Sequence, residues 1–91
     1  MRHNWLAARR PLIKERDALE KRLATLTGER SLLETRLADP ALYAATDSAL
    51  LQDLLKRQGA LVQEIDALEA RWLTLEEGLE ALGDAPEATN M

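Results

Sequence analysis

Few residues of this chain have the type and spacing that catalysis or metal binding requires. There is no cysteine, which excludes thiolate nucleophiles, disulfides and cysteine-ligated zinc. His3 is the only histidine and has no cluster of acidic residues near it in the sequence, so we expect a solvated terminal side chain. The motifs G-x-x-x-x-G-K-S/T, G-x-G-x-x-G and G-x-S-x-G, which bind phosphates or present a nucleophile, do not occur. We therefore expect no catalytic, cofactor-binding or metal-binding residue here.

The charges that remain are distributed unevenly. Residues 1–22 carry seven Arg or Lys against three acids, whereas residues 64–91 carry eight acids against Arg71 alone, in a chain of net charge −4. Such polarity is typical of a basic nucleic-acid-binding arm beside an acidic tail. It is equally typical of two strands of one hairpin that neutralise each other.

The composition favours long helices over a globular core. The apolar 46% of the 91 residues is almost all Leu and Ala, and aromatic residues make up 3%, as in coiled coils. The length allows one small domain. No apolar run approaches the roughly 20 residues that span a bilayer. The first residues lack the apolar stretch of a signal peptide, so we expect a cytoplasmic protein with no membrane contact.

Two heptad runs define the elements. In the first, seam positions fall at Leu12, Arg16, Leu19, Leu23, Leu26, Arg30, Leu33 and Leu37. In the second they fall at Leu51, Leu54, Gln58, Leu61, Ile65, Leu68, Trp72, Leu75, Leu79 and Leu82. Steps that alternate between three and four residues over several heptads indicate a coiled coil.

Pro40 lies between the runs and disfavours helix in the residue before it. We predict an all-α fold, a two-helix antiparallel coiled-coil hairpin with a short Asp-Pro turn. Thr46 or Asp47 is the expected N-cap of the second helix. The predicted ranges are a lead-in over 1–9 that can be helical, a hairpin over 10–82 (helix 11–37, turn 38–47, helix 48–82), and a disordered tail over 83–91.

The register of the two helices is open at this point. One admissible register sets Leu19 against Trp72, Leu26 against Ile65 and Leu33 against Gln58, but a slip by one heptad fits the seam equally well. The polar seam residues, which are Arg16, Arg30 and Gln58, are interpreted as devices that control register at some cost in stability.

Two groups of cations are candidates for binding phosphate. The first flanks the turn and consists of Arg30, Arg36, Lys56 and Arg57. The second consists of Arg9, Arg10 and Lys14. We expect the C-terminal acids to neutralise most of the positive charge from residue 9 to residue 22, which leaves the turn group freer.

Gly28 and Gly59 fall on outward heptad positions. Each costs about 1 kcal/mol relative to alanine in a helix, so a close approach by the backbone of a partner would explain them. The alternative is that the charges are ordinary solvated groups and the glycines are merely tolerated.

Three segments carry a resemblance to a known family. They are Arg10-Pro11-Leu12, the turn Asp39-Pro40-Ala41-Leu42-Tyr43, and Trp72-Leu73-Thr74-Leu75-Glu76 near the end of the second run. With the Asp-Pro-x-Leu-Tyr and Trp-x-x-Leu-Glu patterns at a compatible separation, the chain resembles the C-terminal domain of bacterial ABC-F ATPases over about residues 10–82.

This resemblance implies an accessory, non-catalytic part of a larger cytoplasmic ATPase that acts at the ribosome. The ATP and magnesium sites would lie in the ATPase cassettes of the same chain, and this part would hold no cofactor. The partner it implies is DNA or ribosomal RNA, bound weakly through backbone phosphates, with a monomer favoured over a homodimer. The alternative is a structural or protein-interaction coiled coil, acting as a spacer or dimerisation module without nucleic-acid binding.

Overall fold

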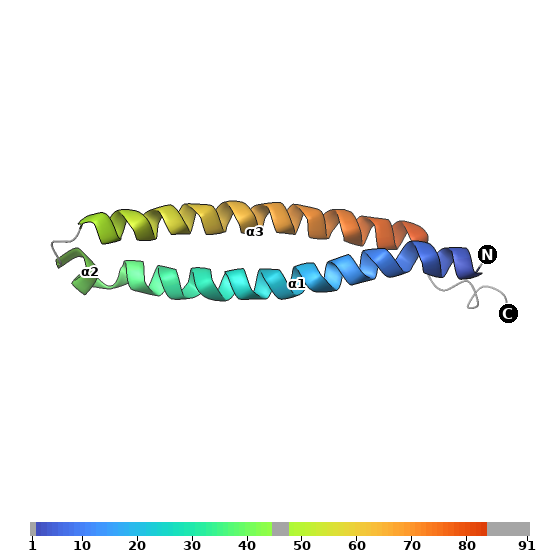
Figure 1. Cartoon of the computed structure of the whole chain (residues 1–91), viewed down its shortest axis with the longest axis horizontal. Coiled ribbons are helices and arrows are strands. Elements are labelled where there is room, and N and C mark those ends of the chain that lie inside the picture. The colour runs from blue at the N-terminus through green and yellow to red at the C-terminus, as the bar shows by residue number, and fades with distance from the viewer. Residues whose placement is uncertain (1, 45–47, 84–91) are drawn as a thin grey trace.

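The computed structural model describes residues 2–44 and 48–83, with the side chains of residues 2 and 3 left outside the description. Helix α1 covers Arg2–Ala38, the short helix α2 covers Pro40–Ala44, and helix α3 covers Ser48–Leu82. These residues contain no strand, so the all-α prediction is confirmed for the described part of the chain. The molecule is a rod with extents of 70 × 17 × 15 Å (Figure 1).

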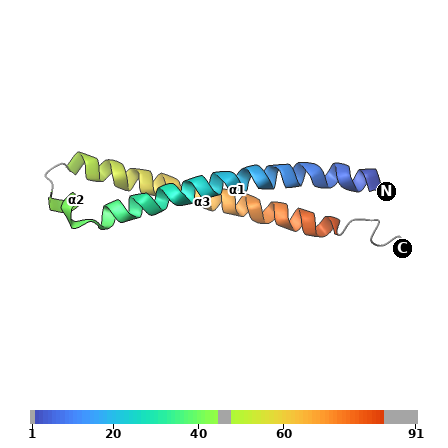
Figure 2. The same cartoon turned by 90° about the horizontal axis from the view of Figure 1, so that it is seen from below.

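Helices α1 and α3 run antiparallel along the whole rod (Figure 1). In the view at 90° to this one, the two helices are seen to cross near the middle of the rod (Figure 2). The N-terminal end of α1 lies beside the C-terminal end of α3, where the Trp5 indole N–H donates to the carbonyl of Leu82 at 3.2 Å. At mid-rod the Trp72 indole N–H donates to Glu20 at 2.9 Å. This contact places Trp72 beside Leu19, as in the register set out above.

The core is a single row of aliphatic side chains between the two helices. All of its buried members occupy predicted seam positions: Leu19, Leu26, Leu33, Leu61, Ile65, Leu75 and Leu79. Leu23, Leu37, Leu54 and Leu68 are partly buried against the same row. Because a two-helix rod covers each seam residue from few directions, even central positions such as Leu68 stay half-buried. Burial of this row is the main source of stability.

One flank of the seam, which we call the paired edge, carries three ion pairs between α1 and α3. They join Glu15 to Arg71, Arg22 to Glu64, and Glu29 to Arg57. The sign alternates from one heptad to the next on each helix, and the two alternations are complementary. A slip by one heptad would place Glu opposite Glu and Arg opposite Arg. The paired edge therefore selects the observed register over its nearest competitors, because like charges directly opposite each other are penalised.

Helix α1 begins at Arg2, nine residues before the expected start at Pro11. Pro11 lies inside the helix and is exposed. The proline lacks the N–H that would bond to the carbonyl four residues earlier. Contacts with the end of α3 favour the extra turns: besides Trp5, Arg9 donates to the carbonyl of Leu79 at 3.5 Å. Both side chains bond to carbonyls in the last turn of α3, where a helix leaves part of its acceptor capacity unused. Residues 2–10 are thus helical and continue α1 along the end of α3.

Local hydrogen bonds define the end of α3 and the start of α2. Gly83 adopts φ +72° and donates its N–H to the carbonyls of Leu79 and Glu80, an arrangement that glycine allows at a helix C-terminus. Between α1 and α2, the Asp39 carboxylate accepts the N–H of Ala41 at 3.0 Å and so caps α2, with Pro40 at its first position.

The Tyr43 hydroxyl donates to the carbonyl of Leu37 at 2.6 Å and ties α2 back to the last turn of α1. The Asp-Pro-x-Leu-Tyr motif thus has a physical role in the connection. The residues that complete the connection to α3, 45–47, lie outside the description, as do the expected N-caps Thr46 and Asp47 and residues 84–91 of the predicted tail.

Candidate nucleic-acid interface

The four cations expected to be free near the turn differ in what they contact. The guanidinium of Arg57 binds Glu29 with two hydrogen bonds, one of them 2.9 Å from Nη2 to Oε1. The hydrogen bond from Arg57 holds the pKa of Glu29 below its ordinary value. Arg57 is therefore already engaged by a carboxylate, and a phosphate would have to displace Glu29 in order to bind it.

Arg30 lies partly covered in the seam, with its Nε 3.6 Å from the carboxylate of Glu34 one turn away. Arg36 and Lys56 are exposed, and neither side chain has a hydrogen bond or ion pair within residues 2–44 and 48–83. Arg36 continues the paired edge of α1 by one heptad, but α3 places Leu50 at the facing position instead of an acid. The tip thus offers two uncommitted cations, Arg36 and Lys56, instead of four.

The N-terminal group divides in the same way. The Arg9 guanidinium stacks over the Trp5 ring at 5.3 Å and bonds to the carbonyl of Leu79, so its role is structural. Arg10 and Lys14 are exposed and have no ion pair to any described residue. Lys21, which was not among the candidates, lies one heptad beyond Lys14 on the same face and is likewise exposed and unpaired in the described part.

Of the six cations from Arg9 to Arg22, two pair with described C-terminal acids: Arg16 with Glu76 at 3.1 Å and Arg22 with Glu64 at 3.0 Å. Arg9 bonds to a carbonyl instead. The other three, Arg10, Lys14 and Lys21, are exposed on the side of α1 that points away from α3, so the described acids of α3 do not pair with them. We call these three residues the outer stripe. It extends over roughly 16 Å of helix at 1.5 Å per residue.

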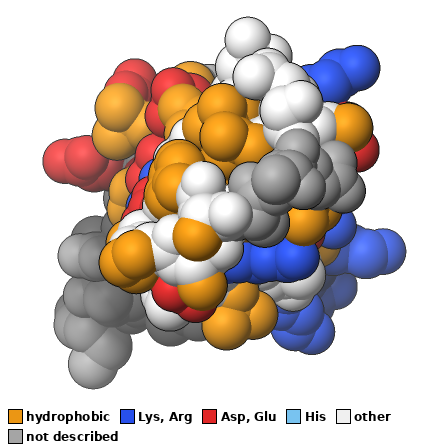
Figure 3. Space-filling model, turned by 90° about the vertical axis from the view of Figure 1, so that its left-hand side faces the viewer, with side chains coloured by type: hydrophobic (Ala, Val, Ile, Leu, Met, Phe, Trp, Pro, Cys, Tyr) orange, Lys and Arg blue, Asp and Glu red, His pale blue; other side chains and the backbone are white. Residues whose placement is uncertain are grey.

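The overall charge distribution fits this division. Figure 3 looks along the rod from the turn end and shows Lys and Arg side chains mainly on one side, with Asp and Glu mainly on the opposite side. Positive charge is therefore concentrated locally even though the chain as a whole is acidic. Such local concentration is what attracts a polyanion.

Two open grooves lie along the rod. One, at the end opposite the turn, has a volume of about 400 Å³ and is lined mostly by charged residues, among them Arg9, Arg16 and Glu76. The other, at mid-rod, has a volume of about 480 Å³ and is lined by Leu23, Trp72 and Leu73 with a glutamate on each helix. Within the described residues no group of three or more His, Asp or Glu side chains could hold a metal ion. None of the described helices has an apolar stretch long enough to cross a membrane.

The glycines separate into two kinds. A Cβ built on Gly78 would lie 3.3 Å from Leu12 Cδ1, so α1 and α3 approach closely there. A Cβ on Gly28 or Gly59 would meet nothing within 4 Å. No packing among the described residues therefore requires glycine at 28 or 59. Gly28 lies one heptad beyond Lys21, at the end of the outer stripe.

Comparison with known proteins gives one match. A family model described as the ABC transporter C-terminal domain matches residues 10–77. This range contains the turn motif, Trp72 and the paired edge, and it agrees with the resemblance inferred from the sequence. Neither a search of curated proteins nor a search of solved structures gave a significant match.

Proposed function

This chain belongs to the ABC transporter C-terminal domain family, and we propose that it contacts nucleic acid as the accessory domain of an ABC-F type ATPase. In this proposal the hairpin is not catalytic. ATP and magnesium are bound by cassettes elsewhere in the parent protein, which works in the cytoplasm at the ribosome. The family membership supports the accessory role, and the nucleic-acid contact rests on the charges described above.

The observation that carries the proposal is the outer stripe. Arg10, Lys14 and Lys21 lie on one exposed face and are not paired with any described carboxylate. Each can contact a phosphate without first breaking an ion pair, so the contact costs only the side chain's own ordering and desolvation. Phosphate contacts of this kind position a protein on nucleic acid and do not read its sequence. The proposed target is therefore the backbone of DNA or structured RNA.

Arg36 and Lys56 at the tip are a second contact for a long ligand that follows the rod. Gly28 is consistent with this geometry, since the absence of a side chain there lets a backbone approach the end of the outer stripe. With so few free cations on an acidic chain, affinity will be weak and strongly dependent on salt. The domain then supplements contacts made by the rest of the parent protein.

The test is the affinity of the 91-residue chain for a fluorescently labelled DNA duplex and a labelled RNA hairpin at low salt, followed by anisotropy. Replacing Arg10, Lys14 and Lys21 together by alanine should weaken binding by about tenfold or more, as expected for the loss of several phosphate contacts. Replacing Arg36 and Lys56 by alanine should weaken it by a smaller factor.

A matched control adds the same negative charge elsewhere. Ala67→Glu, Ala70→Glu and Thr74→Glu lie at exposed positions on the outer face of α3, at least three helical turns from Lys56. Together they lower the net charge as much as the loss of the outer stripe does. This control should change the affinity by less than about threefold, because distant surface charges are screened at a Debye length of ~10 Å. Equal effects of both triple variants, or no binding by the unaltered chain, would refute the proposal.

The alternative function, a structural or protein-interaction coiled coil, is supported by a different part of the surface. The seam leucines are buried between two helices of the same chain, which favours a monomer over a dimerisation module. The flank opposite the paired edge, however, leaves large apolar side chains exposed on α3. A protein contact and a nucleic-acid contact would use separate faces of the rod and are compatible with each other.

A further inference from the structure

The flank of the seam opposite the paired edge is lined by exposed apolar side chains on α3 instead of ion pairs. We call this flank the open edge. On α3 it exposes large apolar side chains where the paired edge carries charges: Leu55 is 43% exposed, Val62 39% and Leu73 54%. Leu55 and Val62 are one heptad apart and Glu69 follows at the next heptad, so these residues lie in one line along α3. Solvent-exposed apolar side chains that gather on one face of a helix mark an interaction surface more often than scattered ones do.

Charges across the open edge do not match as they do on the other flank. On this flank α1 carries Glu20, Thr27 and Glu34, and α3 carries Leu55, Val62 and Glu69, so the two helices do not present opposite charges to each other at these positions. Within the described residues the one ion pair that joins the helices on this flank is that of the seam residue Arg16 with Glu76. The open edge is therefore apolar along its centre and acidic at its margins.

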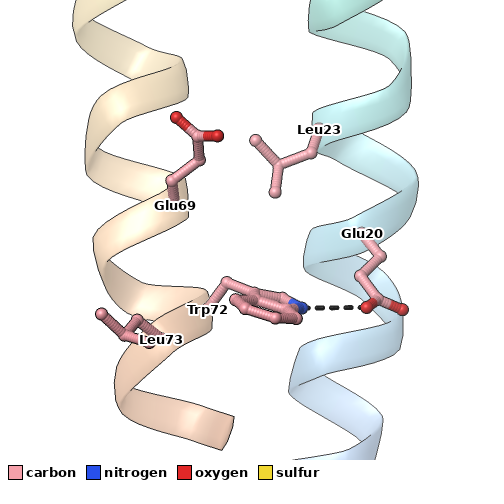
Figure 4. Close-up of a pocket in the computed structure, with 5 residues that line it drawn as sticks. All are labelled: Glu20, Leu23, Glu69, Trp72 and Leu73. Atoms are coloured by element: carbon pink, nitrogen blue, oxygen red, sulfur yellow. Dashed lines mark hydrogen bonds between the residues drawn. The ribbon is translucent and has the colours of Figure 1, made fainter.

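Trp72 lies at the middle of this edge and lines a groove between the two helices. Figure 4 shows its indole lying across the gap between the helices, with its N–H donating to the Glu20 carboxylate at 2.9 Å. Leu23 of α1 and Glu69 of α3 point toward each other one turn further along. The resulting groove of about 480 Å³ has Leu23, Trp72 and Leu73 as its apolar lining and one glutamate from each helix at its margins.

The charge of the groove decides between possible occupants. Phosphates would be repelled by Glu20 and Glu69, so this face is not a second nucleic-acid site. A second copy of the chain, docked with its own open edge, would bring the same carboxylates of both copies together. A basic partner has neither problem, because its cations would pair with Glu69, which has no ion pair to a described residue, and with Glu20, whose charge Arg16 offsets only through space. They could also stack on the part of the Trp72 indole that α1 leaves uncovered.

We propose that the open edge docks a basic amphipathic helix of another protein. Its apolar residues would lie along Leu55, Val62 and the Trp72–Leu73 groove, and its Lys or Arg side chains would reach Glu20 and Glu69. The line from Leu55 to Leu73 spans roughly 27 Å at 1.5 Å per residue, so the docked helix has about five turns. Laying an apolar helical stripe into a groove is a common mode of peptide recognition. The proposal is independent of nucleic-acid binding, which uses the outer stripe.

The experiment uses the 91-residue chain and designed labelled peptides of about 18 residues. The basic peptide has Leu at every third or fourth position with Lys and Arg flanking this stripe, and its control has Glu in place of each Lys and Arg. The basic peptide should bind in an anisotropy titration and the acidic one should not. Val62→Ser with Leu73→Ser should weaken binding at least fivefold, whereas Ala60→Ser with Ala67→Ser, exposed on the outer face of α3, should leave it unchanged.

A second pair of variants separates docking from general attraction between a basic peptide and an acidic protein. Glu69→Lys lies on the open edge and Asp53→Lys lies away from it, and both raise the net charge equally. Glu69→Lys should lower the affinity at least fivefold and Asp53→Lys by less than twofold. Equal effects would overturn the proposal in favour of non-specific electrostatics. So would sedimentation of the chain alone as a dimer that Leu73→Ser dissociates, since the occupant would then be a second copy.

Discussion

Replacing Leu26 by alanine tests the seam at one of its most covered residues. Leu26 has no exposed surface, whereas Leu32, six residues further along α1, is 76% exposed. The two substitutions remove the same atoms from the same helix, so helix propensity affects both equally. Any difference between them in the free energy of unfolding measures burial alone.

The magnitude follows from the geometry. Leu→Ala at a buried site costs about 2–5 kcal/mol, and the cost is lowest where the surroundings can collapse or fill with water. In a rod two helices thick the gap left at Leu26 is close to solvent on both flanks, so we expect about 2–3 kcal/mol. Natural domains of this length have a total stability of roughly 5–14 kcal/mol. The loss corresponds to a fall in Tm of roughly 10–20 °C.

Circular dichroism during thermal and urea unfolding measures both variants. Leu32→Ala should change the free energy of unfolding by less than about 0.5 kcal/mol, as surface substitutions usually do. If Leu26→Ala also costs less than that, Leu26 is exposed in solution and the heptad phase is wrong. If both cost 2 kcal/mol or more, Leu32 is covered by an unrecognised contact such as a second chain.

Three further outcomes follow from the structure. The Arg57 hydrogen bond lowers the pKa of Glu29 from its ordinary value of 4.5, so the ion pair stabilises the fold above that pH and this contribution is lost as the pH falls below it. Tm should therefore fall less on acidification in Glu29→Gln than in the unaltered chain. The same fall in Tm in both chains would contradict a stabilising Glu29–Arg57 pair. Gly28→Ala and Gly59→Ala should each stabilise the chain by about 0.5–1 kcal/mol, because a Cβ meets nothing at either site; a lower Tm in either would reveal a contact that the fold does not show. Pro11→Ala should raise the stability by about 1–3 kcal/mol by restoring a helical hydrogen bond, and a loss of helicity in the same melts would mean that α1 starts at Pro11.

The seam was predictable from sequence because one residue type recurs at one spacing. Leu19, Leu26 and Leu33 fall every seven residues, and all three are buried. The register was not predictable from these residues, since one leucine packs as well as the next. The signal that fixes it was present at the paired edge, where Glu15, Arg22 and Glu29 alternate in sign against Arg71, Glu64 and Arg57. Comparing the charges at those positions between the two heptad runs would have identified the register.

The candidate site was only partly predictable, because pairing depends on which residues face each other across the hairpin. Arg57 was counted as free from its sequence neighbours, yet its partner Glu29 is 28 residues away. Lys21 was assigned to the neutralised segment, although its heptad position points away from α3. Both errors come from counting charge along the chain instead of around the helix. The role of Trp5 in closing the end of α3 had no sequence signal, since it requires knowing that the helix continues through a proline.

The salt dependence of binding shows whether the outer stripe contacts backbone phosphates. The logarithm of the binding constant should fall linearly with the logarithm of the salt concentration, with a slope of about −0.9 per phosphate contact on duplex DNA. Lys14→Ala with Lys21→Ala should reduce the steepness of that slope by about 2, whereas Ala67→Glu with Ala70→Glu should leave it unchanged. An unaltered slope in the lysine variant, or binding that does not depend on salt, would contradict such contacts.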